Sequence, residues 1–429
     1  VFTQAEIKME KLSLYQAAEI LDIPLEIIRS WEKKKLLRSK ANNNQQRLFD
    51  LEELETLQKE LSGEYKILED ERKTNFKIIE LFAGCGGMAL GLENAGLQTN
   101  LLVEIDKNCV NTLLTNRPQW QIIHDDVANL NFTKYRGEID IVAGGFPCQA
   151  FSYAGFGKGF ADTRGTLFFE FARCVSEVKP KIAIAENVRG LISHQKGKTL
   201  AKILKVLDEL GYSVTYKLLS AQFLDVPQKR ERVIIIAIRK DLNIEPLFPR
   251  EKNYTISLKE ALKNCPSSLG VTYNQRKKAI MELVPPGGNW RNLPVEIQKT
   301  YMKQSYYRGG GRTGFAKRLA WNEPALTITC SPAQTQTERC HPDETRPLTV
   351  REYARIQTFP DEWEFTGSLT SQYKQIGNAV PVNMAYHLGK ALIAMLSKKR
   401  ERERQVSAPK ISAKETTNYI QLSIPGLNL

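Results

Sequence analysis

Apolar residues recur at helical spacing in the first sixty or so positions of the chain. The segments LYQAAEILDI, from Leu14, and LEIIRSWEKK, from Leu25, each place apolar side chains on one face, and a break at residues 22–24 separates them. The second segment keeps Arg29 and Lys33 on a face apart from its apolar side chains. This pattern predicts an N-terminal all-α helix-turn-helix module over residues 1–62.

The pattern changes after residues 63–75, a polar and charged segment that we expect to be a linker. Apolar runs of strand length then alternate with helical stretches, and the runs span residues 76–82, 101–105, 139–143, 181–185, 214–219 and 233–238. Strands that alternate with helices are typical of an α/β fold with a doubly wound parallel sheet. We therefore predict such a domain over residues 76–246.

Regular alternation fails beyond Arg239. The run Pro285-Pro286-Gly287-Gly288 and a second glycine run at 309–311 mark a loop-rich region in which basic and aromatic residues are interleaved. We predict a smaller domain over residues 247–371. Helical patterns return near the end, so residues 372–396 are expected to rejoin the α/β domain and residues 397–429 to form a flexible tail.

The composition fits a folded protein that binds a polyanion. Hydrophobic residues make up 42% and charged residues 25% of the chain, which is ordinary for globular domains and excludes collagen-like chains. Lys and Arg number 61 against 48 Asp and Glu, and the net charge of +13 favours a nucleic acid partner, DNA or RNA. The longest aliphatic run, 233–238, is too short to cross a membrane, and the first thirty residues hold no signal-peptide core, so we expect a cytoplasmic protein.

The seven cysteines form neither a disulfide framework nor a zinc motif. The loose grouping of Cys330, Cys340 and His341 lacks the four closely spaced ligands of structural zinc, and we expect no metal. Cys148 stands apart, because in GGFPCQAFS it follows a proline directly after an apolar strand run, at the edge where α/β sheets place ligands. It is a candidate nucleophile, although buried and inert cysteines are common.

Other polar residues follow strand runs in the same way. The turn FAGCGG, which holds Gly84 and Gly86, follows the first strand, Glu104 ends the second, and Asp126 follows another. A glycine-rich turn lets the backbone approach a ligand, and an acid at a strand end can accept hydrogen bonds from ribose hydroxyls, which points to an adenosine-bearing cofactor. Glycines also serve tight packing in such turns, so the turn alone leaves both interpretations open.

Two further motifs follow along the chain, ENV with Glu186 at the end of a strand run and QKRER with Arg230 and Arg232 before another. Together with FAGCGG, GFPCQAFS, RGTLFFEFAR, RPLTVREYARIQTFPDEW and QIGNAVPV, in this order, they resemble the DNA (cytosine-5-)-methyltransferases, the modification methylases of prokaryotic type II restriction-modification systems, over residues 77–394. The resemblance implies a doubly wound, Rossmann-like S-adenosylmethionine-dependent methyltransferase sheet with a smaller target-recognition domain.

The resemblance also implies which residues act. S-adenosylmethionine would be bound by Phe82, Gly84, Gly86, Glu104, Asp126, Val127, Pro147, Leu167 and Asn378. The catalytic residues carried over are Cys148, Glu186, Asn187, Arg230 and Arg232.

The chemistry of the family accounts for these residue types. C5 of cytosine is too weak a nucleophile to take a methyl group from a sulfonium, but addition of a thiolate at C6 makes C5 enamine-like. Cys148 would supply the thiolate, Glu186 would hydrogen-bond N3 and the amino group, and Arg232 would bind O2. The cytosine must be flipped out of duplex DNA, since the stacked base hides C6.

The first sixty or so residues resemble the winged helix-turn-helix of MerR-like regulators, in which the second helix enters the major groove. Arg29 and Lys33 would then contact operator DNA. In the methyltransferase family such modules are associated with control of restriction-modification genes, which implies a cognate restriction endonuclease as a functional partner. Asp22 and Pro24 depart from the usual turn glycine and Ser/Thr cap, so a helical packing module stays an alternative.

The loop-rich region falls where this family keeps its target-recognition domain. Arg308 and Arg312 are candidates for guanine contacts, with phosphate binding or solvent exposure as alternatives. The stretch WNEPALTITCSPAQTQTERCHP resembles methylases with short GC-rich palindromic sites such as GGNCC or GGCC. Two other functions stay open: a tRNA methyltransferase, whose hallmark Cys-Phe-Thr is absent here, and a DNA-binding regulator with an inactive methylase half.

Overall fold

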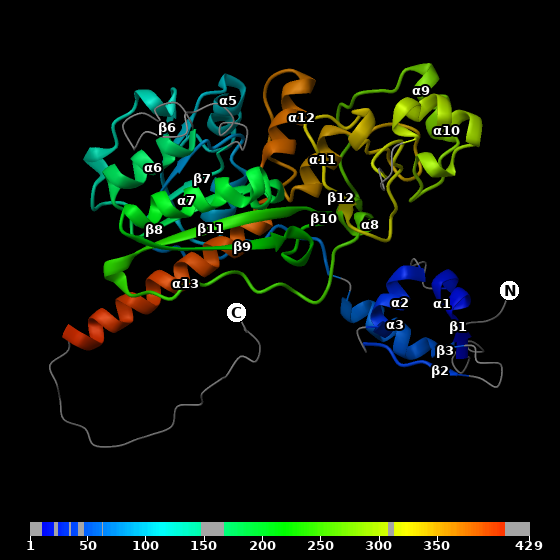
Figure 1. The fold of residues 1–429 in the computed structure, drawn as a ribbon, viewed down its shortest axis with the longest axis horizontal. Coiled ribbons are helices and arrows are strands. Elements are labelled where there is room, and N and C mark those ends of the chain that lie inside the picture. The colour runs from blue at the N-terminus through cyan, green and yellow to red at the C-terminus, as the bar shows by residue number, and fades with distance from the viewer. Residues whose placement is uncertain are drawn as a thin grey trace.

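The structure is a computed structural model that describes residues 11–20, 25–33, 36–41, 47–61, 63–146, 167–307 and 313–407. It contains a seven-stranded sheet with helices on both faces, a loop-rich region beside the sheet, and a small N-terminal module (Figure 1). Four residues of the predicted site, Pro147, Cys148, Arg308 and Arg312, lie outside the described residues, as does the end of the predicted tail.

The central sheet has the strand order β6-β5-β4-β7-β8-β11-β9. Its strands are β4 (Lys77–Leu81), β5 (Gln98–Glu104), β6 (Ile122–His124), β7 (Ile141–Gly144), β8 (Ile182–Val188), β9 (Tyr212–Ser220) and β11 (Glu231–Arg239). The strands from β6 to β8 are parallel, whereas β11 runs antiparallel to both of its neighbours. The prediction of an α/β sheet is confirmed, with the correction that the sheet is mixed. Residues 221–230 are too few for a parallel crossover between β9 and β11.

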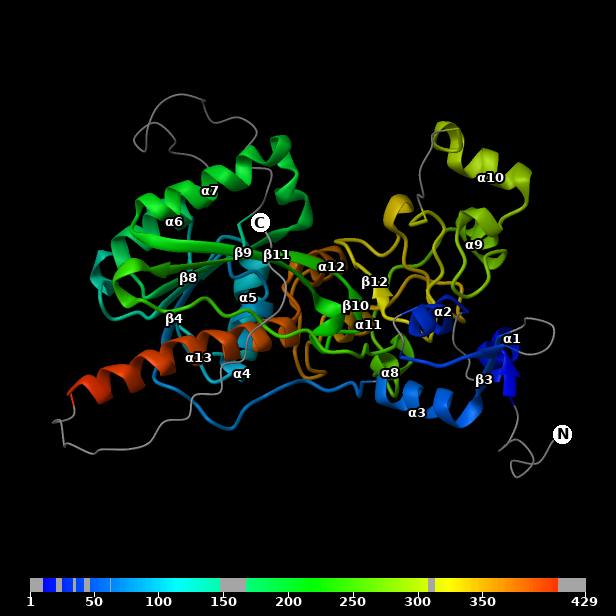
Figure 2. The same cartoon turned by 60° about the horizontal axis from the view of Figure 1, so that its bottom comes forward.

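Helices cover both faces of the sheet, as Figure 2 shows. One face carries α6 (Leu167–Val178) and α7 (Lys198–Glu209), and the other carries α4 (Gly87–Asn94) and α13 (Val382–Ser407). In β11, Val233 and Ile235 pack in the first core, while Ile234 and Ile236 pack in the second. A strand buried on both faces is apolar at successive positions, which explains the uninterrupted aliphatic run in the sequence.

The C-terminal part of the chain returns to the first β/α unit. Helix α12 (Leu369–Asn378) leads into α13, which packs closely along α4. A Cβ atom on Gly91 would lie 2.2 Å from the carbonyl oxygen of Val382, and one on Gly389 would lie 2.5 Å from Cβ of Ala95. Glycine at both positions therefore permits this approach. Helix α13 continues to Ser407, past the predicted end near residue 396.

The loop-rich region holds short helices and one short strand pair. The helices are α8 (Leu258–Leu262), α9 (Gln275–Glu282), α10 (Val295–Met302) and α11 (Val350–Ile356), and β10 (Gln228–Lys229) pairs with β12 (Ala325–Leu326). Met281, Trp290 and Ala316 belong to a core of their own. Residues after Leu348 instead share a core with Ala83, next to the first strand of the large sheet.

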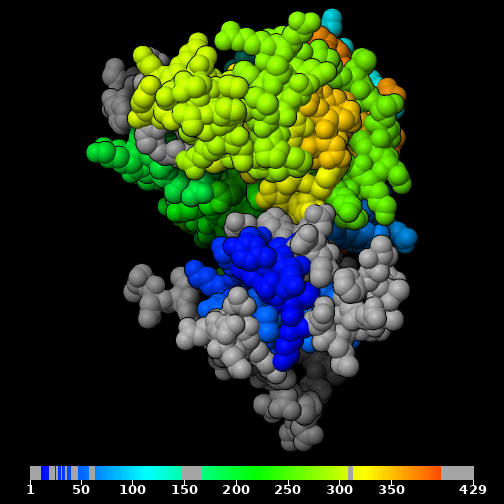
Figure 3. Space-filling view, turned by 90° about the vertical axis from the view of Figure 1, so that its right-hand side faces the viewer, coloured from blue at the N-terminus to red at the C-terminus, as the bar shows by residue number. Residues whose placement is uncertain are grey.

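The N-terminal module combines helices with a small antiparallel sheet of order β1-β3-β2, which the all-α prediction omits. Its elements are β1 (Lys11–Ser13), α1 (Leu14–Ile20), α2 (Leu25–Lys33), β2 (Lys40–Ala41), β3 (Arg47–Asp50) and α3 (Leu51–Leu61). Leu12, Ile28, Phe49 and Leu54 form its core. Strands of two to four residues are too short for an alternating pattern to reveal. Figure 3 shows this module, in blue, beside the loop-rich region.

Residues 63–75, predicted as a linker, lie extended along the α/β domain, and we call this segment the strap. Tyr65 Oη donates to the carbonyl of Arg355 at 3.1 Å, and Leu68 N donates to Oδ1 of Asn383 at 3.0 Å. Lys390 of α13 forms an ion pair with Asp70. The strap is thus attached to the domain by its own backbone and side chains. No helix in the described ranges is long and apolar enough to cross a membrane.

Candidate active site

The predicted functional residues gather at one edge of the sheet. The strand order reverses between β4 and β7, and ligands of α/β proteins bind at such a switch point, beyond the carboxyl ends of the strands. The turn at 82–86 follows β4, and the segment that contains Cys148 follows β7. Neighbouring strands bring further predicted residues to this edge: Glu104, Asp126, Glu186 and Asn187.

The two glycines of the glycine-rich turn have different roles, one in packing and one in leaving space for a ligand, which the sequence alone did not distinguish. Gly84 and Gly86 both have positive φ angles, of 55° and 90°. A Cβ on Gly86 would lie 2.7 Å from Cδ2 of Leu113, so this glycine serves packing. A Cβ on Gly84 would have no atom of the described chain within 4 Å, so its backbone borders open space. Helix α4 starts directly after the turn, and no side chain of the described residues caps its first amides.

Glu104, the last residue of β5, is fixed by three backbone amides. Its Oε2 accepts from Gly84 N at 2.7 Å, and its Oε1 accepts from Ile105 N and Asp106 N at 2.9 and 2.8 Å. The side chain is almost buried, with 8% exposure. Oε2 accepts one of these three bonds and has a further lone pair, so the group can still accept a hydrogen bond from a hydroxyl. An acid held rigidly beside Gly84 fits the ribose of an adenosine.

Four more predicted cofactor residues lie near the same edge. Asp126 caps a short 3-10 helix at Val127–Asn129, and its Oδ1 accepts from Ala128 N at 3.0 Å. Val127 is buried, and its carbonyl accepts from Nη2 of Arg173 at 2.8 Å. Leu167 begins α6 and packs against the core, as does Phe82. Val127 therefore shapes the wall of this region, while Asp126 offers it a carboxylate.

Glu186 and Arg232 form an ion pair in which Nε lies 2.6 Å from Oε1. Both side chains are mostly buried, with exposures of 13% and 12%. A Cβ on Gly145 would lie 3.3 Å from Oε2 of Glu186, so this carboxylate stands beside the chain that leads to Cys148. Two of the five predicted catalytic residues are thus in direct contact.

Asn187 fixes the backbone in the same place. Its Nδ2 donates to the carbonyl of Phe146 at 2.8 Å, and its Oδ1 accepts from Val188 N at 2.9 Å. The side chain is buried. Since Phe146 is the last described residue before the segment with Cys148, the structure places Asn187 as a support for the start of that segment.

Arg230 is separated from this pair and lies in the interior, with 1% exposure. Its guanidinium donates to the carbonyls of Gly377 and Ala379, both at 3.0 Å, and to that of Ile328 at 3.3 Å. Burial, followed by the charge of Arg232, lowers the pKa of Arg230. The structure therefore places Arg230 as a link between QKRER, the loop-rich region and the end of α12.

Asn378 ends α12 and is exposed beside this link. The thiol of Cys330 donates to its Oδ1, at an Sγ–Oδ1 distance of 3.0 Å. Sequence reasoning missed this contact, because Cys330 belongs to a stretch assigned to target recognition. It also missed Gln228, which joins Gln357 to Ile328 through its side-chain amide. The sequence did offer a signal for Gln228, because it is the first residue of the motif QKRER.

Arg29 and Lys33 are both exposed on α2. They line one hollow of the N-terminal module together with Arg47, which comes from β3 and which sequence reasoning missed. Glu32 forms an ion pair with Arg47, and its Oε1 accepts from Oγ of Ser39 at 2.5 Å. The helix and the small sheet thus present basic side chains on a common surface.

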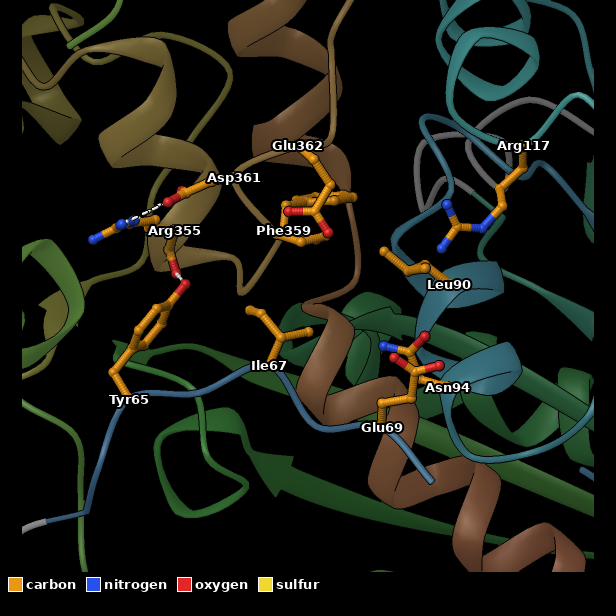
Figure 4. Close-up of a pocket in the computed structure, with 11 residues that line it drawn as sticks. Tyr65, Ile67, Glu69, Leu90, Asn94, Arg117, Arg355, Phe359, Asp361 and Glu362 are labelled. Atoms are coloured by element: carbon orange, nitrogen blue, oxygen red, sulfur yellow. Dashed lines mark hydrogen bonds and ion pairs between the residues drawn. The ribbon is translucent and has the colours of Figure 1, made fainter. Parts of the chain in front are cut away.

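A separate cavity of about 290 Å³ lies at the strap (Figure 4). Its walls include Tyr65 and Ile67 of the strap and Asn94 at the end of α4, opposite the helix end that faces the candidate site. Arg355 and Asp361 pair with each other in its wall, with a distance of 2.6 Å between Nη2 and Oδ2. This cavity is therefore distinct from the edge where the predicted residues gather.

Comparison with known proteins places the chain in a family. Residues 76–394 match the C-5 cytosine-specific DNA methylase family, and residues 12–59 match the MerR HTH family of regulatory proteins. The chain is 51% identical to the type II methyltransferase M.Eco47II of Escherichia coli, over 92% of this chain and 98% of that protein. It is 53% identical to M.Sau96I of Staphylococcus aureus, over 76% and 77% of the two chains.

A solved structure from Escherichia coli, a prophage-encoded protein described as a DNA modification methyltransferase, superimposes with a TM-score of 0.56. Its identity is 25%, and the match covers 75% of this chain and 99% of that one. The family match covers most of the chain and includes every strand of the large sheet. The chain belongs to the C-5 cytosine-specific DNA methylase family and is a type II methyltransferase that carries a MerR-type helix-turn-helix segment at its N-terminus.

Proposed function

We propose that this enzyme uses S-adenosylmethionine to methylate C5 of a flipped-out cytosine within a short, specific duplex DNA sequence. The observation that carries the proposal is the ion pair of Glu186 and Arg232 next to Gly145, at the start of the segment that holds Cys148. An acid and a guanidinium at this edge can bind the polar side of a cytosine while a thiolate attacks its ring.

The residues at the edge fit the cofactor. The open space beside Gly84, the start of α4, which no described side chain caps, and the fixed carboxylate of Glu104 together suit an adenosine with an attached charged chain. When bound, S-adenosylmethionine supplies an electrophilic methyl group on a sulfonium. We assign its binding to Phe82, Gly84, Gly86, Glu104, Asp126, Val127, Pro147, Leu167 and Asn378.

The proposed mechanism begins at Cys148, which lies outside the described residues. Its thiolate forms a bond to C6 of cytosine, and the electron pair of the C5–C6 double bond shifts toward C5. Glu186 hydrogen-bonds N3 and the amino group and stabilises the proton held there. C5 then takes the methyl group, whose bond to the sulfonium sulfur breaks and would leave a neutral thioether. C5 next loses its proton to a base, and the cysteine thiolate leaves as the C5–C6 double bond re-forms.

The ion pair explains how two residues hold one base. A guanidinium has five N–H groups in a plane, so Arg232 can keep Glu186 in place and still donate to O2 of the cytosine. Since both side chains are mostly buried, their hydrogen bonds are strengthened by the low local dielectric. The pair is therefore set before the substrate arrives, which reduces the reorganisation needed in the transition state.

We further propose that the loop-rich region selects the target, a short GC-rich palindrome, with Arg308 and Arg312 among its DNA contacts. Methylation would then protect the DNA against a cognate restriction endonuclease. The N-terminal module would bind a separate operator through Arg29 and Lys33, and Arg47 from β3 supports this role because it extends the same basic surface. Regulation of transcription would follow from operator binding.

The first test is incubation of the full chain with labelled S-adenosylmethionine and mixed-sequence duplex DNA. We expect label in 5-methylcytosine, and Cys148→Ala should abolish it. Duplexes with 5-fluorocytosine at the target should trap a covalent adduct with the wild-type enzyme only, because the fluorine cannot leave as a proton does. Label in tRNA and none in DNA would overturn the assigned substrate.

The second test addresses the target and the regulation. Methylation-sensitive sequencing of DNA from cells that express the chain should show one short methylated motif. A footprint of the protein upstream of its own gene, lost in the double variant Arg29→Ala and Lys33→Ala, should identify the operator. Binding by the double variant at wild-type affinity would contradict the regulatory role.

A further inference from the structure

The backbone on both sides of Asn378 is held by a buried network. Arg230 donates to the carbonyls of Gly377 and Ala379 at 3.0 Å each, and Nε2 of Gln357 donates to that of Ala379 at 2.9 Å. Both Arg230 and Gln357 are buried. The backbone at the end of α12 is therefore fixed in position, whereas the orientation of the exposed Asn378 side chain depends on other contacts.

A second segment presses against this helix end. A Cβ on Gly377 would lie 2.4 Å from the carbonyl oxygen of Thr329 and 2.8 Å from Cys330 N. Two backbones can approach this closely only where no side chain intervenes. The contact holds Cys330, which comes from the loop-rich region, directly beside Asn378, which comes from the returning C-terminal part.

The thiol of Cys330 then determines how the amide of Asn378 is turned. Sγ lies 3.0 Å from Oδ1, and since an amide oxygen carries no hydrogen, the thiol is the donor. With its oxygen engaged in this way, the amide presents Nδ2, a donor of two hydrogen bonds, on its other side. A cysteine at this exposed position contributes little packing, so orientation of the amide is its main structural effect.

We propose that Cys330 is a positioning residue for the cofactor: its thiol holds the Asn378 amide so that Nδ2 can donate to an acceptor of bound S-adenosylmethionine. The inference rests on the proposed role of Asn378 in cofactor binding. Its consequence is that the region which selects DNA also contributes to cofactor affinity, through a single side-chain hydrogen bond.

The test is the affinity of the full-length enzyme for S-adenosylmethionine, measured by titration calorimetry in the absence of DNA. Cys330→Ala should weaken binding about five-fold, the usual effect of one hydrogen bond, and Cys330→Ser should restore most of it because a hydroxyl also donates. The kcat at saturating cofactor and the KM for DNA should change by less than about two-fold. The control is Cys265→Ala, which removes a partly exposed thiol remote from Asn378 in the sequence.

A double-mutant cycle separates this inference from the proposed cofactor site. If Asn378→Ala weakens cofactor binding and Cys330→Ala adds nothing in that background, the positioning role is supported. If Asn378→Ala weakens binding but Cys330→Ala has no effect alone, or the same effect in both backgrounds, the role of Cys330 is overturned while the cofactor site stands. If Asn378→Ala leaves binding unchanged, the assignment of Asn378 is wrong, and the inference falls with it.

Discussion

Arg232 and Glu186 face each other diagonally across two antiparallel strands. In the register of the sheet, Arg232 of β11 pairs with Val188 of β8, and Glu186 pairs with Ile234, yet the ion pair joins the two charged residues at 2.6 Å. Such a diagonal contact is within reach of long side chains on one face of a sheet. The two proposed catalytic groups are therefore positioned by the register of two paired strands.

Replacing Glu186 by Gln should lower kcat by about a hundred-fold or more, because the amide cannot hold a proton at N3 as the carboxyl group does. The affinity for S-adenosylmethionine should stay close to that of the wild type. The matched control is Glu231→Gln, which neutralises a partly exposed carboxylate paired with Arg189 at 2.7 Å and should retain activity. Equal losses in both variants, measured in single-turnover assays, would argue against a chemical role for Glu186.

Gly377→Ala should destabilise the enzyme by about 1–3 kcal/mol, because the new Cβ would lie 2.4 Å from the Thr329 carbonyl oxygen. Gly84→Ala makes a useful contrast, since its Cβ would meet open space and only its φ of 55° is strained. The first variant should lower the unfolding midpoint more, and the second should weaken cofactor binding more. Titration calorimetry and thermal unfolding of both variants would reveal the reverse pattern if these assignments are wrong.

Removal of the N-terminal module should leave methyltransferase activity intact only if the strap is kept. Deletion of residues 1–62 retains the contacts of Tyr65, Leu68 and Asp70, whereas deletion of residues 1–72 removes them. We expect the shorter deletion to keep wild-type activity and the longer one to unfold at a lower denaturant concentration. Equal stability of the two truncated proteins would show that the strap contributes nothing to the domain.

Asp225 should make stability fall in acid. Burial opposes its ionisation, but hydrogen bonds from His387 and Tyr254 outweigh burial and lower the pKa of Asp225. Because the unfolded-state pKa, about 4, is the higher one, ionised Asp225 stabilises the fold above about pH 4, and this contribution is lost as the pH falls through the folded-state pKa. Asp225→Asn should therefore flatten the loss of stability below about pH 4 in urea unfolding, whereas the control Asp208→Asn, at an exposed pair with Lys240, should leave that loss in place.

DNA binding by the N-terminal module should depend on salt through its basic surface. Each phosphate contact contributes about 0.9 to the slope of log K against log salt, so Arg29→Ala with Lys33→Ala should reduce that slope by about 1 to 2 for operator DNA. Lys11→Ala, in an exposed position of β1 outside the hollow, is the matched control. An unchanged slope in the double variant would place the DNA contacts elsewhere.

The sheet could be predicted well from the sequence, because buried strands appear in it as runs of apolar residues. The run at 233–238 is apolar at every position since β11 is covered on both faces, and the acids at strand ends had to meet at one edge because parallel strands share a direction. The direction of β11 was harder to predict from the sequence, since it depends on the length of the connection at 221–230.

The roles of individual residues were harder to predict, because they depend on contacts between distant parts of the chain. The motif QKRER identifies two arginines but does not show that Arg230 is buried while Arg232 meets Glu186. The turn FAGCGG does not show that Gly86 packs on Leu113 while Gly84 borders open space. The bond from Cys330 to Asn378 depends on how two separate regions meet, which no local pattern encodes.

Because α13 packs along α4, the hydrophobic core on this face of the sheet can be completed only late in the synthesis of the chain. Ile78, Ile141 and Ile184 belong to strands made early, and they share their core with Met384 and Leu388 of α13, which leaves the ribosome late. Until then this apolar face of the sheet lacks its cover, and the site lacks Asn378. A nascent chain therefore gains its full hydrophobic core and its proposed cofactor contact at nearly the same moment, so an unfinished polypeptide is both aggregation-prone and inactive.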